Sequence, residues 1–298
     1  MLENYTGELA GLGAALAWAI ASVLFRRLGS HVAPLALNLY KGVIATGMLL
    51  SVLAIRPDLV KAIDAGPLTM LLLSGAIGIG IGDTAFFAAL NRLGERRTVL
   101  MAETLTPPMA ILIAFIFLAE VLSLYAMLGI AITVAGVSWV IMEGKPDQAI
   151  DRVRARWGIV FGLTAALCQS LGAVISRGAM NEAGVDPIYS SLVRIVGGIA
   201  ILLIWIPATR QSFFPPAVRS GKLWAVIAGT TFIGTFLGII LQQTALKHTP
   251  AGIAQTLLGT SSLFILPLVV VGGEKISLRA IAGAVIAVAG IAILFAVE

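Results

Sequence analysis

The stretch "AEVLSLYAMLGIAITVAGV", residues 119–137, has a near copy in "GEKISLRAIAGAVIAVAGI", residues 273–291. Both stretches carry a glutamate near the start and a pair of glycines at the same spacing. Matches recur in the same order and at nearly the same offset at two other places, which argues against chance. These further pairs are "GLGAALAWAIASVLFR" (11–26) with "GLTAALCQSLGAVISR" (162–177), and "VAPLALNLYKG" (32–42) with "VDPIYSSLVRI" (185–195). The chain therefore contains an internal repeat.

The composition indicates that lipid is the solvent for most of the chain. Hydrophobic residues make up 59% of the 298 positions and charged residues 12%, against roughly 25% charged residues in a soluble domain. The mean hydropathy of +1.00 would leave large apolar patches exposed on a water-soluble protein. A membrane-spanning helix needs about 20 apolar residues. Charges, prolines and glycines divide the sequence into ten such segments, predicted near 8–28, 34–54, 67–90, 97–119, 122–142, 157–179, 186–207, 222–246, 250–272 and 277–296.

The repeat and the span count together predict the topology. Each copy holds five spans, and because five is odd, the second copy enters the membrane from the opposite side, as in many secondary transporters. We therefore predict an all-α, polytopic membrane protein whose ten transmembrane helices form two inverted five-helix repeats. The expected division is a first repeat at 1–142, a linker "EGKPDQAIDRVRAR" at 143–156, and a second repeat at 157–298.

Several classes of function are disfavoured by the residues themselves. The net charge is +5, but the basic residues are scattered in short loops and form no stripe, so no nucleic-acid partner is expected. Cys168 is the only cysteine, and His31 and His248 are the only histidines, so no metal site is expected. No phosphate-binding loop, HExxH or GxSxG pattern is present. We accordingly expect no cofactor, and a membrane-embedded enzyme is the least favoured of three functional hypotheses.

Two further features carry a resemblance to a known family. A glutamate opens the last hairpin of each half, Glu120 in one and Glu274 in the other, and "GIGDTAFFAALNRLG" (80–94) is similar to the family's third span. Over nearly its whole length the chain resembles the drug/metabolite transporter superfamily, in particular its ten-helix EamA-like members. The resemblance implies a pseudo-two-fold bundle around a central cavity, alternating access without ATP, and export of small metabolites.

Four charged residues are predicted to lie inside spans: Lys41, Asp83, Glu103 and Arg194. A charge at the bilayer centre costs about 2.5–3.5 kcal/mol on insertion scales, so such residues are expected to face a cavity or a partner. Arg194 and Lys41 are repeat equivalents, each seven residues, or about 10 Å, beyond a proline that opens its helix. Inversion predicts one cation near each mouth of a shared cavity, where each can hold a substrate carboxylate. The structural alternatives are an ion pair and a cation that reaches the interface.

Asp83 and Glu103 have no acidic equivalents in the second half, so the fold itself does not require them. Burial favours the neutral form of a carboxyl group, and we therefore predict that these two residues couple transport to protons. The structural alternatives are a hydrogen bond from Asp83 to backbone near the glycines of 75–82, and an ion pair between Glu103 and Lys41.

The remaining lining is expected from polar and aromatic residues at matching places in the two halves. The predicted substrate-binding set is Trp18, Asn38, Lys41, Gln169, Arg194, Gln255 and Thr260, although polar groups of this kind also join helices to one another. Prolines are expected to interrupt the fourth span at Pro107 and Pro108 and the ninth at Pro267. Glu120 and Glu274 are expected to cap the helices that follow them. The paired glycines predict packing between the fifth and tenth spans, or a homodimer contact.

The sequence thus predicts a multi-pass protein of the inner (plasma) membrane that moves a small metabolite by alternating access. An amino acid or related amphipathic carboxylate is the substrate that Arg194 and Lys41 favour, and export follows from the resemblance alone. A lipid or lipid-linked head-group flippase is the second hypothesis. Lys and Arg concentrate in the loops on the side of the 143–156 segment, which the positive-inside rule places in the cytoplasm. The resemblance implies the reverse orientation, so both remain open.

Overall fold

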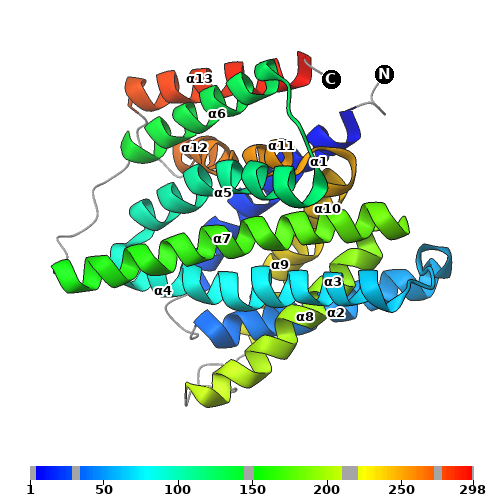
Figure 1. Ribbon diagram of the computed structural model, residues 1–298. Helices are drawn as coiled ribbons and strands as arrows, with labels where there is room; N and C mark the ends of the chain where they lie inside the picture. The colour runs from blue at the N-terminus through cyan, green and yellow to red at the C-terminus, as the bar shows by residue number, and fades with distance from the viewer. Residues whose placement is uncertain (1–4, 29–33, 144–150, 210–220, 272–276, 297–298) are drawn as a thin grey trace.

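A computed structural model describes residues 5–28, 34–143, 151–209, 221–271 and 277–296, and throughout these ranges the regular structure is helical (Figure 1). The helices in chain order are α1 (Thr6–Leu28), α2 (Pro34–Ile55), η2 (Pro57–Leu59), α3 (Ala65–Gly75), η3 (Ala76–Gly82), α4 (Asp83–Leu93), α5 (Glu95–Leu118), α6 (Leu124–Glu143), α7 (Arg152–Ala183), α8 (Pro187–Ala208), α9 (Gly221–Thr231), η5 (Phe232–Leu237), α10 (Gly238–His248), α11 (Ala251–Leu258), α12 (Ser261–Val271) and α13 (Leu278–Ala296).

These helices confirm the all-α, polytopic fold. Within the described residues, nine helical segments are long and apolar enough to cross a membrane. Together with the 23-residue α1, they correspond to the ten predicted spans. Three spans consist of more than one helix: α3, η3 and α4 form the third, α9, η5 and α10 the eighth, and α11 and α12 the ninth.

The fifth and tenth spans pack through their glycines in an antiparallel arrangement. A Cβ atom added to Gly129 would lie 3.1 Å from the carbonyl oxygen of Gly290, and one added to Gly283 would lie 3.1 Å from that of Gly136. Gly129 is the repeat equivalent of Gly283, and Gly136 is the equivalent of Gly290, so each contact is the symmetry mate of the other. Helices α6 and α13 are therefore related by a two-fold axis perpendicular to them. The predicted packing of these spans is therefore confirmed, and so is the inversion of the repeats, because an axis along the helices would make α6 and α13 parallel.

The same two-fold relation holds for two other pairs of spans that pack between the halves. The first span runs antiparallel to the eighth, with Gly13 against Leu241 and Trp18 against Gly234. The sixth span runs antiparallel to the third in the equivalent way, with the Ser74 hydroxyl donating to the Gly172 carbonyl over 2.7 Å. Each half thus contributes its first span to the third span of the other, and the two repeats interlock rather than pack as separate units.

The third and eighth spans each contain a π-helical segment, η3 and η5, at equivalent positions of the repeat. A π-helical turn inserts into an α-helix without a clear sequence signal and is frequent at functional sites. Three glycines of η3 are buried, and the segment packs against α7 and α8. The two π-helical segments therefore mark one level of the bundle, where the halves meet.

The ninth span is broken, but not at its proline. Helix α5 continues through Pro107 and Pro108, and α12 continues through Pro267, so the expected proline interruptions are wrong. The break instead falls at Gly259 and Thr260, between α11 and α12. The fourth and ninth spans approach each other at this break. Pro107 has no N–H for the Glu103 carbonyl, and Gly259 lies beside that carbonyl, which is 3.5 Å from where its Cβ would be.

The start of the sixth span and the role of Glu120 differ from the predicted ones. Helix α7 begins at Arg152, earlier than expected, because the Asp151 carboxylate accepts hydrogen bonds from the backbone N–H groups of Val153 and Arg154 at 3.1 and 3.3 Å. Glu120 does not cap the helix that follows it: its carboxylate accepts from the Ala251 N–H at the start of α11, 3.0 Å away, and from Arg177. Glu274 lies outside the described residues.

We predict that Gly136→Ala destabilises the protein by about 1–3 kcal/mol, because overpacking at a close contact forces the backbone apart. The added Cβ would lie 2.4 Å from the backbone nitrogen of Ala287. Thermal unfolding of the purified protein in detergent measures the effect. Gly229→Ala is the matched control, since a Cβ there meets nothing within 4 Å; equal unfolding temperatures for the two variants would contradict the packing described.

Candidate functional site

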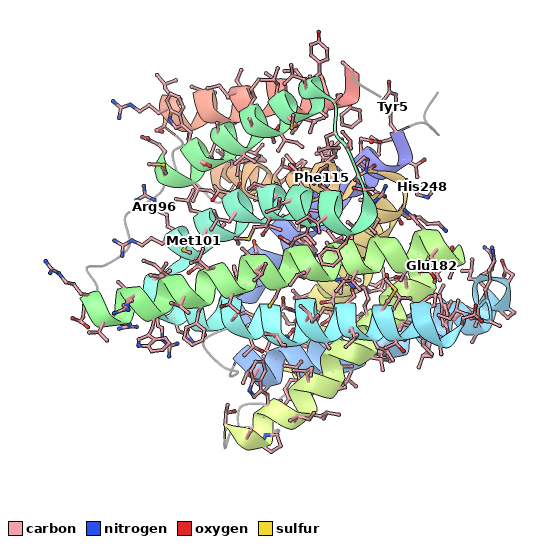
Figure 2. All side chains as sticks on the ribbon, viewed as in Figure 1. Tyr5, Arg96, Met101, Phe115, Glu182 and His248 are labelled. Atoms are coloured by element: carbon pink, nitrogen blue, oxygen red, sulfur yellow. The ribbon has the colours of Figure 1, made fainter. Side chains whose placement is uncertain are left out.

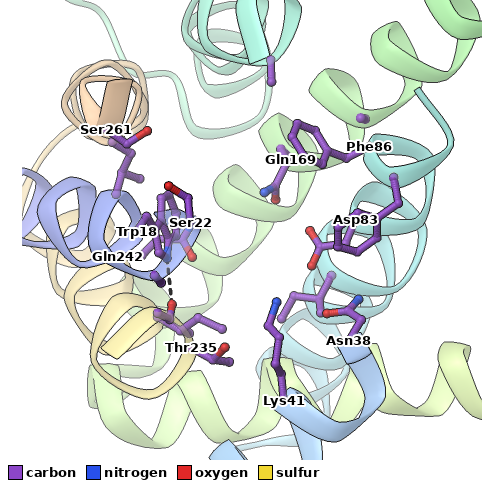
Figure 3. A pocket seen from close by; sticks show the side chains of 18 of the residues that line it. Trp18, Ser22, Asn38, Lys41, Asp83, Phe86, Gln169, Thr235, Gln242 and Ser261 are labelled. Atoms are coloured by element: carbon purple, nitrogen blue, oxygen red, sulfur yellow. Dashed lines mark hydrogen bonds between the residues drawn. The ribbon is translucent and has the colours of Figure 1, made fainter. Parts of the chain in front are cut away.

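A cavity of about 720 Å³ lies between the two repeats (Figure 3). Eight of the ten spans contribute to it; the fifth and tenth do not. The polar and charged side chains in its lining are Trp18, Ser22, Asn38, Lys41, Asp83, Asn91, Glu103, Thr106, Gln169, Arg194, Thr235, Gln242, Gln255 and Ser261. Such a volume suits a small metabolite.

The lining is not symmetric along the membrane normal. In Figure 2 one end of the bundle carries Arg96 and Met101, and the other carries Glu182 and His248. We call the first the linker end, because α6 ends and α7 begins there, and the second the terminal end. The cavity reaches Leu90 and Asn91 near the linker end, where α4 finishes at Leu93. Nothing in its lining comes from the last turn of α10, which ends at His248 on the terminal side.

Hydrogen bonds close the terminal end. Arg177 binds the Glu120 carboxylate and donates to the Leu246 carbonyl over 2.5 Å. The Lys247 ammonium donates to the Val185 carbonyl over 2.9 Å. In addition, the Thr249 hydroxyl donates to the buried Glu8 carboxylate over 3.0 Å. All these contacts hold the connection between α10 and α11 against other helices at the terminal end. The contacts are Arg177–Glu120, Arg177–Leu246, Lys247–Val185, Thr249–Glu8 and Ala251–Glu120.

Arg194 lies at the deep end of the cavity, in α8, with only 1% of its surface exposed. Its Nη1 donates to Gln243 Oε1 over 2.6 Å, and its charge interacts with that of Asp83. The Nε atom has no hydrogen-bond partner among the described residues. On the other side of the guanidinium, Nη2 would be 3.4 Å from a Cβ on Gly78 of η3. The π-helical segment therefore leaves room for this cation.

Lys41 lines the same cavity as Arg194, and both interact electrostatically with Asp83. These interactions do not indicate one cation at each mouth: both cations lie near Asp83 in the cavity wall. Asn38 and Asp83 lie beside Lys41 (Figure 3). Asp83 is the first residue of α4, directly after η3. The group carries two positive charges and one negative charge, so this wall is basic.

Glu103 lies at the crossing of the fourth and ninth spans. Its carboxylate accepts hydrogen bonds from Ser261 Oγ at 2.7 Å and Ser262 Oγ at 3.0 Å. These serines form the first turn of α12, where a helix N-terminus favours negative charge. Its hydrogen-bond partners are thus the serines rather than the Lys41 considered from sequence. Gln255, in α11 just before the break, also lines the cavity.

Trp18 and Gln169 occupy equivalent places on the two inverted halves. The Trp18 indole Nε1 donates to the Gly234 carbonyl of η5 over 3.0 Å. Gln169 Oε1 lies 3.4 Å from where a Cβ on Gly78 of η3 would be. Each side chain therefore faces the π-helical segment of the opposite half, and one is aromatic while the other is polar. The two halves therefore place a side chain at the same position, but with different chemical properties.

Of the residues expected to form the site, all but one line the cavity. Thr260 stands apart, because its hydroxyl donates to the Leu257 carbonyl of its own chain segment over 2.6 Å and its neighbour Ser261 faces the cavity instead. Sequence reasoning missed Phe86, Phe87 and Gln242, which line the cavity. The signal was available in the repeat, since the pair Phe86–Phe87 matches the pair Gln242–Gln243 at the offset that relates Gly78 to Gly234. Where the structure describes side chains, no three His, Cys, Asp or Glu residues gather to hold a metal ion.

Inverted repeats that enclose a polar cavity in a lipid-facing bundle define a class of protein, the membrane transporters. The comparisons assign the family within that class. The model of the EamA-like transporter family matches residues 5–142 and again residues 156–296. The chain belongs to the EamA-like transporter family.

Two similar proteins agree with this assignment. One, described as an uncharacterized transporter of Archaeoglobus fulgidus, is 24% identical over 290 residues, which cover 96% of each chain. A solved crystal structure superposes with a TM-score of 0.79 at 17% identity, covering 98% of this chain and 96% of that one. The second likeness shows that the fold is shared.

We predict that Trp18→Phe destabilises the protein by about 0.5–1.5 kcal/mol, because the hydrogen bond from the indole to the Gly234 carbonyl is lost. Thermal unfolding in detergent is the measurement. Trp157→Phe serves as the control, since Trp157 is 56% exposed. An unfolding temperature for Trp18→Phe that matches the control would show that the hydrogen bond to η5 contributes nothing.

Proposed function

We propose that the protein is a secondary transporter of small amphipathic carboxylates, with amino acids as the first candidates, and that it needs no cofactor and catalyses no reaction. The observation that carries the proposal is Arg194, a guanidinium buried at the deep end of a cavity. Its direct hydrogen-bond partner Gln243 is neutral. A planar guanidinium binds a carboxylate through two parallel hydrogen bonds, and the excess positive charge of this wall favours an anion.

Other parts of the lining favour an apolar body on the substrate. Trp18, Phe86 and Phe87 line the cavity together with aliphatic residues of α8. An aromatic wall packs against a hydrocarbon group and buries its surface at about 25 cal/mol per Å². A carboxylate with an apolar side chain matches both parts of the lining.

We further propose alternating access between the repeats 1–142 and 157–298. The cavity extends toward the linker end, and hydrogen bonds close the terminal end. Because the repeats are inverted, exchange of their conformations would close the linker end and open the terminal end. The positive-inside rule supports a cytoplasmic linker end, so the conformation described would receive substrate from the cytoplasm of an inner-membrane exporter.

Replacing Arg194 is the direct test of carboxylate recognition. In liposomes that contain the purified protein, we expect Arg194→Gln to lower uptake of radiolabelled amino acids in exchange for unlabelled ones at least tenfold, which corresponds to about 1.4 kcal/mol of binding. Arg279→Gln, an exposed arginine at the start of α13, should leave uptake unchanged. Equal exchange by wild type and Arg194→Gln, or exchange of lipids but of no carboxylate, would refute the proposal.

We also propose that Asp83 or Glu103 carries a proton during transport. Asp83→Asn and Glu103→Gln remove the titratable group while keeping its shape. At least one of the two should abolish uptake driven by a pH gradient and retain exchange at equal pH. Glu182→Gln, at an exposed position of α7, is the control. If both variants respond to the pH gradient as wild type does, transport is not coupled to protons through these residues.

A further inference from the structure

Gln243 is a fully buried side chain in α10 that makes hydrogen bonds to two other spans. Its Nε2 donates to Ser176 Oγ in α7 over 2.5 Å and to Ser190 Oγ in α8 over 2.6 Å. Its Oε1 accepts from Nη1 of Arg194 over 2.6 Å. Both hydrogens of the amide nitrogen are thus committed to serines, which leaves the oxygen for the guanidinium.

This arrangement fixes the orientation of the guanidinium rather than neutralising its charge. An amide oxygen is a neutral acceptor, so Arg194 keeps its positive charge and its attraction for an anion. Nη1 is occupied on the side away from the cavity. The remaining edge carries Nη2, which faces Gly78, and Nε, which is buried without a partner among the described residues. Nε is enclosed by protein atoms, so Nη2 is the atom of this edge through which a carboxylate oxygen can bind the guanidinium.

The first repeat lacks this arrangement. Gln243 corresponds to Phe87 at the offset that relates Gly78 to Gly234. Arg194 corresponds to Lys41 at the slightly smaller offset that relates Pro34 to Pro187. Phe87 provides no hydrogen-bond acceptor for a cation, and a lysine ammonium has no planar edge to orient. Only the second repeat therefore combines a planar cation with an amide that fixes its direction, although both repeats supply a cation to the cavity.

We propose that Gln243 is a positioning residue for substrate recognition: it fixes the guanidinium of Arg194 so that Nη2 binds the substrate carboxylate. Gln243 does not line the cavity and does not touch the substrate. This inference rests on the proposed carboxylate transport and adds the residue that sets its geometry. It predicts that affinity for carboxylates changes when only the hydrogen bonding of Gln243 changes.

The experiment compares two ligands that differ in one group. Isocaproate carries a carboxylate, and isocaproamide carries a neutral amide on the same apolar chain. Dissociation constants for both are measured by calorimetric titration of the purified protein in detergent, for wild type, Gln243→Glu and Gln243→Met. Thr231→Val is the control, because Thr231 is equally buried but lies outside the cavity lining. Ser176→Ala combined with Ser190→Ala provides a milder variant that keeps Gln243 itself.

Wild type and Thr231→Val are expected to bind isocaproate at least tenfold more tightly than isocaproamide. Gln243→Glu places a permanent carboxylate against Arg194, so this preference should fall about tenfold. Gln243→Met and the double serine variant should raise the dissociation constant for isocaproate several-fold and leave that for isocaproamide unchanged. If Gln243 contributed only to packing, its replacement would weaken the binding of both ligands equally or of neither.

The outcomes separate this inference from the proposed function. If wild type prefers the carboxylate and every folded Gln243 or serine variant keeps the full preference, Gln243 does not position Arg194, while carboxylate recognition stands. If wild type itself binds the two ligands equally, Arg194 does not recognise a carboxylate, and both the proposed function and this inference fail. Should Gln243→Glu not fold, the serine variant gives the same decision.

Discussion

A guanidinium inside a lipid-facing bundle must have polar surroundings, and the fold of this chain provides them for Arg194. Burying such a charge without partners costs several kcal/mol, more than a marginally stable protein can absorb at many sites. Gln243, Asp83 and the cavity offset this cost together. The cavity, the basic wall and the glycines that leave space beside the arginine all follow from this requirement.

The two repeats share a scaffold and differ in their chemistry. Equivalent glycine contacts between α6 and α13, and π-helical segments at equivalent positions, show how closely the backbones correspond. The side chains at equivalent positions have diverged: Trp18 corresponds to Gln169, and Phe87 corresponds to Gln243. A symmetric scaffold can exchange two conformations, while an asymmetric lining can bind an asymmetric solute. At the terminal end, the Arg177–Glu120 contact and the hydrogen bond from the Ala251 N–H to Glu120 join the two repeats.

The sequence predicts the repeats, the spans and most of the lining because apolar periodicity and internal similarity are strong signals. It misleads at the prolines, since α5 continues through Pro107 and Pro108 while the ninth span breaks at Gly259. The break lies beside the Glu103 carbonyl of the fourth span, and no local sequence pattern reveals such a neighbour. It also predicts Lys41 and Arg194 near opposite mouths of the shared cavity, whereas both interact with Asp83, because distance along a helix does not show where a side chain ends. The partner of Glu120 lies in the other repeat, and Gln243 is one amide in an apolar stretch.

The central claim is that a carboxylate-binding cavity between the repeats is open toward the linker end alone. Cys168 is the only cysteine, so Leu90→Cys in a Cys168→Ala background places one thiol near the mouth of the cavity. Labelling with a membrane-impermeant maleimide is measured in vesicles of both orientations. The account predicts fast labelling from the face that carries Arg152 and Arg156, and slower labelling when a transported carboxylate is present. Equal labelling from both faces, or labelling that the carboxylate does not slow, would contradict it.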